Sequence, residues 1–235
     1  MPRALVVAAL LLAGCGSRSA LDYGRAEFED ATVSTAASNP FKCSTCHETG
    51  ATRNKSLPGY TMYDAAVRTA WWGGDVTTLL DATNQCVTQF MRGKALAPDD
   101  EKGRAIFVYL ESLAPDASAP VLSLTVTQNI VDVPSGDATR GKMWWDQGCG
   151  NCHGAPHTGA GRISDVASLV PDDSIAAHGV TPTMGARPVV IEKVRHGKFF
   201  NVGGNMPLFS LEALSDAQLG DILAYLEMFG LPPSQ

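Results

Sequence analysis

The stretch CGNCH at residues 149–153 decides the fold of this chain, and CSTCH at residues 43–47 repeats its pattern. Each reads Cys-x-x-Cys-His, the attachment signature of a c-type haem. Two thiols three residues apart in one helical turn can each form a thioether to a vinyl group of the porphyrin. The histidine that follows is then carried beneath the iron as its proximal ligand. We therefore expect two covalently bound haem c groups, with thioethers from Cys43, Cys46, Cys149 and Cys152 and proximal ligands His47 and His153.

A Cys-x-x-Cys pair has two other interpretations, a thioredoxin-like redox pair and half of a zinc site. Two copies that both end in histidine, in a chain with an export signal, favour haem over either of them.

The first residues predict export and a lipid anchor. Residues 1–14 form an expected signal peptide, because Arg3 precedes an apolar stretch that is too short to span a bilayer. The stretch ends in Leu-Ala-Gly-Cys, which resembles the lipobox of bacterial lipoproteins, so Cys15 is the expected lipidation site. An ordinary cleaved signal peptide is the alternative. We expect a periplasmic protein that residues 15–20 tether to a membrane, and Gly16 after the cysteine favours the outer membrane.

The charge composition limits the classes of partner that the protein can bind. The 235 residues include 18 basic and 24 acidic side chains, for a net charge of −6. This balance gives no support to nucleic-acid binding. An acidic surface suits an electron carrier that docks on basic patches of redox protein partners. With the motif cysteines and Cys15 assigned, Cys86 is the one cysteine left over.

The chain contains the same arrangement of helices twice. A helix is expected before each Cys-x-x-Cys-His motif, at residues 21–32 and 138–147, and each carries a glycine four residues before an aromatic. A strongly periodic apolar helix closes each unit, at residues 100–113 and 215–229.

Both halves resemble class I cytochrome c, in which the first and last helices cross closely at a glycine. By this resemblance Gly24 and Gly141 would face Tyr109 and Tyr225. The expected fold is all-α, with two tandem cytochrome c domains at residues 21–113 and 138–235. Residues 114–137 are the expected linker, an extended connector that lies along both domains and whose middle alternates apolar and polar residues as a strand does.

The expected sixth ligand of the second haem is Met206. It lies in GGNMPLF at residues 203–209, which resembles the methionine loop of class I cytochromes. The alternative ligands are three other methionines and two histidines: Met143, Met184, Met228, His178 and His196. Of these, His196 is expected to lie near the haem propionates with Arg195 and Lys198.

The sixth ligand of the first haem is expected to be Met91, with Cys86 as the alternative. Met91 stands at nearly the same distance before Tyr109 as Met206 does before Tyr225. If the segment is an α-helix, five residues turn by about 500°, so the two side chains diverge by about 140° and cannot both face the iron. Thioether sulfur favours Fe(II), whereas thiolate favours Fe(III).

Residues 84–96 (NQCVTQFMRGKAL) also resemble the first haem domain of thiosulfate dehydrogenases and related sulfur-oxidation cytochromes. In those enzymes a cysteine thiolate binds the catalytic haem, and Cys86 matches it. The resemblance implies a small anionic sulfur substrate, which basic side chains of the first unit could hold. They are Arg53, Lys55, Arg68, Arg92 and Lys94.

The leading functional prediction is a membrane-tethered dihaem cytochrome that passes single electrons between redox partners. Strong ligands on both faces of each iron leave no open position for a substrate, which favours a carrier over an enzyme. The alternative is a thiosulfate dehydrogenase-like dihaem enzyme that uses Cys86 at the first haem. A dihaem peroxidase is disfavoured because Met206 would occupy the second iron.

Overall fold

The computed structural model describes residues 18–178, 185–198 and 204–230. Within these ranges the chain is helical, and it contains no β-strand but only two isolated bridges. The expected all-α fold is confirmed. None of the helices in these ranges has both the length and the apolar character that a membrane span requires. Cys15, Met184 and Gly203 lie outside the described residues, as does the expected signal peptide.

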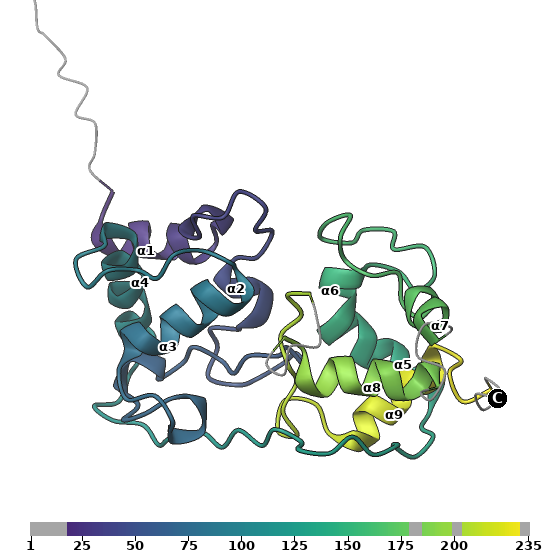
Figure 1. Ribbon diagram of the computed structural model, residues 1–235. Helices are drawn as coiled ribbons and strands as arrows, with labels where there is room; N and C mark the ends of the chain where they lie inside the picture. Colours follow the sequence, from purple (N-terminus) through teal and green to yellow (C-terminus); the bar gives the residue numbers. More distant parts are fainter. Residues whose placement is uncertain (1–17, 179–184, 199–203, 231–235) are drawn as a thin grey trace, which may run out of the picture.

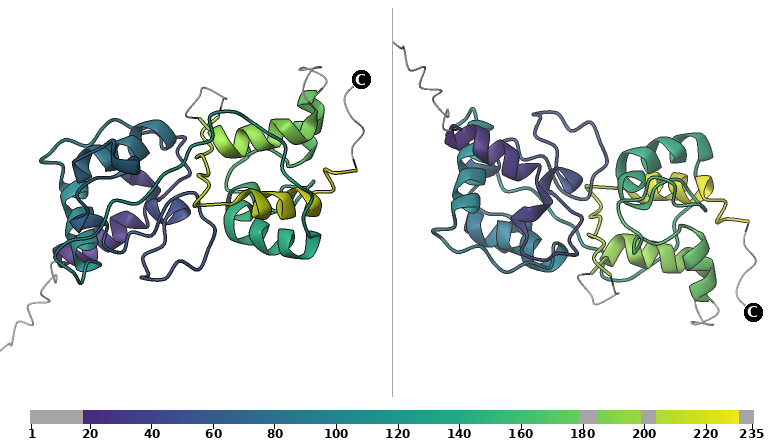
Figure 2. Two further views of the ribbon diagram at one scale, coloured as in Figure 1. Left: turned by 90° about the horizontal axis from the view of Figure 1, so that it is seen from below. Right: turned by 90° about the horizontal axis from the view of Figure 1, so that it is seen from above.

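The molecule has two lobes that can be told apart in all three views and that meet along one boundary (Figures 1 and 2). Each lobe has its own cluster of buried apolar side chains, one drawn from residues 28–110 and the other from residues 133–228. The elements of the first lobe are α1 (Ala20–Phe28), η1 (Ala31–Val33), α2 (Cys43–Cys46), η2 (Ala65–Val67), η3 (Trp72–Gly74), α3 (Leu79–Gln85), η4 (Cys86–Phe90) and α4 (Glu101–Ser112). Those of the second lobe are α5 (Ala138–Trp144), η5 (Trp145–Cys149), α6 (Gly150–His153), α7 (Asp172–His178), α8 (Ala186–His196) and α9 (Asp216–Tyr225).

Each lobe is built on one close helix crossing. A Cβ added at Gly24 of α1 would lie 1.8 Å from the carbonyl oxygen of Ala105 and 3.0 Å from Cβ of Tyr109, both on α4. At Gly141 of α5 it would lie 1.9 Å from the carbonyl oxygen of Asp221 on α9. Only a residue without a side chain permits such contact between two backbones. The predicted pairing of glycine with the opposite helix is confirmed at both crossings.

Side-chain hydrogen bonds to the backbone mark the limits of the crossing helices. The helix expected at residues 21–32 stops at Phe28, because the Asp30 carboxylate accepts a hydrogen bond from the Thr32 amide (2.8 Å) and starts the separate turn η1. Asp100 caps α4 by accepting from the Gly103 amide (2.8 Å), and Ser215 forms a reciprocal capping box with Gln218 at the start of α9.

Residues 114–137 run as an extended segment along one edge of both lobes (Figure 1). Ala119 bridges to Arg68 in the first lobe, and the Tyr60 hydroxyl donates to the carbonyl of Ser123 (2.6 Å). Further on, the Glu212 carboxylate of the second lobe accepts from the amide and hydroxyl of Thr125. Among the described residues, the strand-like pattern in this segment therefore pairs with no sheet. Leu122 and Leu124 line a cavity of the first lobe, whereas Val121 and Val131 are exposed.

A buried carboxylate lies at the crossing of α5 and α9. Asp221 accepts hydrogen bonds from the Asp137 amide (2.6 Å), from two guanidinium nitrogens of Arg140 (2.9 Å each) and from the Trp144 indole (3.3 Å). Its side chain is only 6% exposed. The bonds from Arg140 are the main reason that the pKa of Asp221 is lowered.

Replacing Asp221 by asparagine should destabilise the second lobe at neutral pH. Because the folded pKa is lowered, the contribution of this carboxylate is complete above the ordinary aspartate pKa of about 3.9 and is lost as the pH falls through the folded value. We expect Asp221→Asn to reduce the free energy of unfolding by about 1.5–3 kcal/mol at pH 7, the usual range for hydrogen bonds to a charged group. The difference from wild type should shrink steadily in acid, as measured by thermal unfolding across the pH range.

Asp146→Asn is the matched control, since Asp146 pairs with Lys142 and both side chains are more than half exposed. It should leave the thermal midpoint nearly unchanged. Equal effects of the two substitutions would contradict the assignment.

Candidate haem sites

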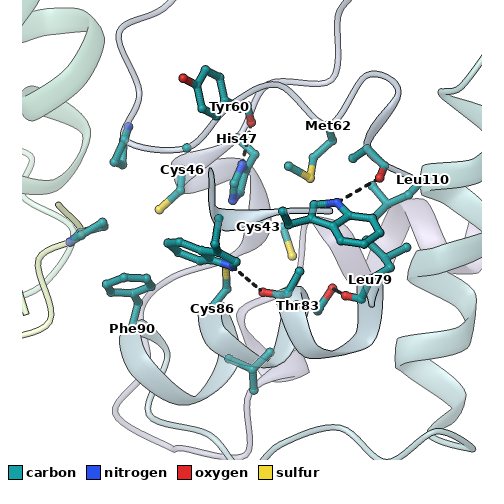
Figure 3. Close-up of a pocket in the computed structure, with 18 of the residues that line it drawn as sticks. Cys43, Cys46, His47, Tyr60, Met62, Leu79, Thr83, Cys86, Phe90 and Leu110 are labelled. Carbon is teal, nitrogen blue, oxygen red and sulfur yellow. Dashed lines mark hydrogen bonds between the residues drawn. The ribbon is translucent and has the colours of Figure 1, made fainter. Parts of the chain in front are cut away.

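The first Cys-x-x-Cys-His motif forms a single helical turn that ends at its histidine. Cys43 and Cys46 are the two ends of α2, and His47 follows with extended backbone as the helix cap. The Nδ1–H of His47 donates to the carbonyl oxygen of Tyr60 (2.7 Å), which leaves Nε2 as the nitrogen able to bind a metal (Figure 3). Burial lowers the pKa of His47, so the imidazole is held in the neutral form that iron requires.

A cavity opens beside these three residues, and its lining is mostly apolar and aromatic. Trp71 and Trp72 are part of the wall, and their indoles donate to the carbonyls of Ala65 (3.1 Å) and Ala82 (3.3 Å). Large apolar neighbours of this kind exclude water from a porphyrin. Others that line the cavity are Phe28, Phe41, Met62, Leu79, Phe90, Ile106 and Leu110.

The second motif repeats the arrangement. Cys149 precedes α6, which contains Cys152 and ends at His153. His153 donates through Nδ1 to the carbonyl of Ser168 (3.0 Å), and burial again lowers its pKa. The ring of Trp145 lies 6.1 Å from the imidazole, between ring centroids. Both motifs thus present two thiols and one oriented neutral imidazole, which is the donor set that a covalently bound haem needs.

Met206 lies in a loop that is fastened to the end of α8. Its carbonyl accepts from the Lys198 amide (3.1 Å), and the Phe209 amide donates to Val194 (2.8 Å). Its side chain is partly buried against the second core cluster. Gly197 has φ +51°, and a Cβ there would lie 2.5 Å from the Met206 carbonyl, so a glycine is needed for this approach.

The rival ligands of the second haem have other surroundings. Met143 is 43% exposed, and Met228 is fully buried in the core cluster. Both ring nitrogens of His196 are engaged, with Glu192 (2.7 Å) and with the carbonyl of Thr127 (2.6 Å). Arg195 is buried and holds Asp216 (2.6 Å) and the Leu214 carbonyl (2.7 Å). Arg195 and His196 therefore fasten the fold, a role that the sequence interpretation missed.

Cys86 and Met91 are closer in orientation than an α-helix would allow. Residues 86–90 form a π-helical turn in which the Met91 amide donates to the Cys86 carbonyl (3.1 Å). A bond between residues five apart brings them to one face of the turn. The expected divergence of about 140° was wrong for this reason, and both residues line the first cavity.

The two residues differ in what surrounds them. Cys86 stands in the cavity near His47 and Cys43 (Figure 3), and burial raises the pKa of its thiol to about 11. Met91 is 5% exposed and belongs to the core cluster that includes Phe28 and Val87. A thiol with so high a pKa stays protonated at neutral pH unless a cation such as iron lies beside it.

The basic side chains of the first unit do not form one group. Arg68 lines the cavity and donates to the carbonyl of Tyr63 (2.8 Å). Arg92 donates to the side chain of Asn205 (2.6 Å), while Lys55 and Lys94 are exposed. Arg53 binds four backbone carbonyls, two of them in the other lobe.

The two motifs lie close together, because a Cβ added at Gly148, just before Cys149, would lie 2.4 Å from the carbonyl oxygen of Ser56 in the loop that follows His47. Burial is the main reason that the pKa of Cys46 is raised, and nearby thiols raise it further. Pro207 and Leu208, which directly follow Met206, line the cavity of the first motif, as do Leu122 and Leu124 of the extended segment. Among the described residues, no group of three or more His, Cys, Asp or Glu side chains is arranged to hold a metal ion by itself.

Comparison with known proteins identifies the class of the second lobe. Residues 136–226 match the family "Cytochrome C oxidase, cbb3-type, subunit III". This part of the chain is a cytochrome c domain, a class of domain that carries covalently bound haem c and takes part in electron transfer. No curated protein matches the chain.

A solved structure of thiosulfate dehydrogenase (TsdBA) from Marichromatium purpuratum, in the as-isolated form, is similar to this chain with 16% identity and a TM-score of 0.42. The similarity covers 88% of this chain and 45% of that one, so the chain spans less than half the length of this structure.

Gly59 controls the orientation of the first imidazole, and replacing it with alanine should disturb the site. An added Cβ would lie 2.3 Å from Cε1 and 2.4 Å from Nδ1 of His47, so the ring would have to move off the Tyr60 carbonyl. We expect Gly59→Ala to weaken or abolish the low-spin electron paramagnetic resonance signal of the haem predicted at the first motif.

Gly50→Ala is the control, because its Cβ would meet only the Thr52 carbonyl at an ordinary 3.5 Å. An unaltered spectrum in Gly59→Ala would show that His47 does not depend on this contact.

Proposed function

We propose that this protein is a periplasmic dihaem c-type cytochrome, anchored to a membrane through Cys15, that passes single electrons between redox protein partners. The observation that carries the proposal is the closeness of the two motifs, because the backbone just before Cys149 touches the loop that follows His47: a Cβ added at Gly148 would lie 2.4 Å from the carbonyl oxygen of Ser56. Two redox centres at such a short separation would form an electron relay within one chain.

Each site residue has a defined part in this relay. When bound, haem c supplies one-electron oxidation and reduction. The cysteine pairs Cys43 with Cys46 and Cys149 with Cys152 would hold it covalently. His47 and His153 would be the iron ligands, and each is oriented by a backbone carbonyl that accepts from Nδ1. Met206 is the proposed distal ligand of the second haem, and its thioether favours Fe(II).

The distal ligand of the first haem is either Cys86 or Met91. The internal repeat favours Met91, as the sequence indicated. The geometry supports Cys86 instead, since this thiol stands in the cavity near His47, whereas Met91, which also lines the cavity, belongs to the core cluster and is only 5% exposed. We therefore propose Cys86, whose thiolate would lower the potential of the first haem relative to the second.

A second candidate function is a thiosulfate dehydrogenase-like enzyme that joins two sulfur substrates at the first haem. The same position of Cys86 favours it, together with Arg68, whose guanidinium lines the cavity and could attract a small anion. A thiolate-ligated haem suits either function, so ligation alone does not separate them.

The relay predicts that each chain carries two haems and accepts two electrons. The full chain should be produced in a host that matures c-type cytochromes, and its intact mass and reductive titration should be measured. We expect the mass of two prosthetic groups and two separate one-electron steps. The mass of one haem, or a single step, would overturn the proposal.

Replacing Cys86 by alanine should change the electron paramagnetic resonance spectrum of one haem, because the iron loses a thiolate. Met91→Leu, which keeps the apolar volume, should leave both spectra as they are. The near-infrared charge-transfer band of a Met-ligated ferric haem should arise from one haem only in the wild type. If Met91→Leu changed the spectrum of one haem and Cys86→Ala changed neither, Met91 would be the ligand.

Thiosulfate oxidation by the wild type, measured with ferricyanide as electron acceptor, separates the two functions. A carrier shows none beyond the rate without protein. Turnover that Cys86→Ala abolishes would establish the enzyme.

A further inference from the structure

Arg53 joins the two lobes through a single guanidinium group. In its own lobe it donates from Nε to the carbonyl of Lys55 (2.9 Å) and from Nη2 to that of Leu57 (2.6 Å). Across the boundary it donates from Nη1 to the carbonyl of Glu212 (3.1 Å) and from Nη2 to that of Ala213 (3.0 Å). All four acceptors are backbone atoms, so the bonds fix the backbone path of both segments.

The segments that Arg53 joins are the ones that follow the iron ligands. Residues 53–57 come shortly after His47, and residues 212–213 come shortly after Met206. Nearby, a Cβ added at Gly148 would lie 2.4 Å from the carbonyl oxygen of Ser56, so the backbone just before Cys149 touches the same loop. The guanidinium therefore ties the segment that follows His47 to the segment that follows Met206.

A guanidinium suits this position better than any other side chain. It presents five N–H donors in a rigid plane and can serve several carbonyls at once, whereas an ammonium is a compact point charge. Its bonds are charge-assisted and therefore stronger than those between neutral groups. Without such a tie, relative motion is the usual behaviour of two domains joined by one segment.

We propose that Arg53 is a positioning residue that holds the two haem sites at a fixed separation, so that an electron passes directly between them. In this step one iron is oxidised from Fe(II) to Fe(III) as the other is reduced from Fe(III) to Fe(II), and no bond or proton changes place. The electron enters from a redox protein partner and leaves to another. The inference rests on the proposed dihaem function, because it requires two haems in one chain.

Other hydrogen bonds cross the boundary singly. Arg92 donates once to the Asn205 side chain (2.6 Å) and the Lys198 ammonium donates to the Gln89 carbonyl (2.8 Å), and both bonds are exposed to solvent. The Arg53 bond to Glu212 is exposed as well, but its bond to Ala213 is partly buried, so it competes less with water than the single exposed bonds do. Loss of Arg53 should therefore let the lobes separate for part of the time while each lobe stays folded around its own core.

The test is the rate of electron transfer between the haems after one of them is reduced by a pulse of methyl viologen radical. We expect Arg53→Ala to slow this step roughly tenfold, which corresponds to about 1.4 kcal/mol in the docking of the two lobes. The rate should also become dependent on viscosity when glycerol is added, because docking now limits it. Haem content and the absorption of each haem should match the wild type.

Arg53→Lys tests the geometry of the donor. It keeps the charge but lacks the planar fork, so we expect it to behave like Arg53→Ala. Lys55→Ala removes one positive charge from an exposed position of the same loop and should transfer electrons at the wild-type rate. Should Arg53→Ala not be recovered with two haems, Arg53→Lys decides the question.

A wild-type rate without viscosity dependence in Arg53→Ala would overturn the inference, and so would full rescue by Arg53→Lys. Failure of the underlying function is distinguishable from both. In that case the wild type itself would carry one haem or would show no transfer between its haems.

Discussion

Two helix backbones touch at one glycine in each lobe, and the rest of the structure depends on this contact. Where α1 meets α4 and α5 meets α9, a carbonyl oxygen occupies the place where a Cβ would stand. The crossing also brings Phe28 of α1 and Tyr109 of α4 together, and their rings pack edge to face in the core (5.5 Å between ring centroids). The crossing thus fixes the frame on which the motif and the ligand loop are held.

Local sequence signals predicted much of this frame. The periodicity of residues 100–113 and 215–229 and the caps at Asp100 and Ser215 located the starts of the closing helices, since side chain and backbone agree at those positions. The glycine spacing predicted the crossings. The fixed spacing that thioether attachment demands also predicts the ligands of the motifs, and these stay predictions. Helix ends were less predictable: α1 ends at Phe28, before the Asp30–Thr32 bond, and α9 ends at Tyr225, four residues before the predicted end.

What could not be predicted depends on contacts between distant segments. The carbonyls of Tyr60 and Ser168 orient the two imidazoles, but any residue supplies a carbonyl, so their sequence carries no signal. The π-helical turn after Gln85 changes which side chains share a face, and no periodicity announces a single such turn. Arg53 looked like one of several basic residues available to a substrate, yet four carbonyls occupy its guanidinium.

The two lobes are alike in plan but differ in how their sites are completed. The cavity of the first motif is closed by Leu122 and Leu124 of the connecting segment and by Pro207 and Leu208 of the second lobe. The two residues that directly follow Met206 therefore also form part of the wall of the other site. Because a packed wall cannot shift without moving its neighbours, a change at Met206 reaches the first cavity through these adjacent residues. The second lobe thus supplies part of the surroundings of the first site.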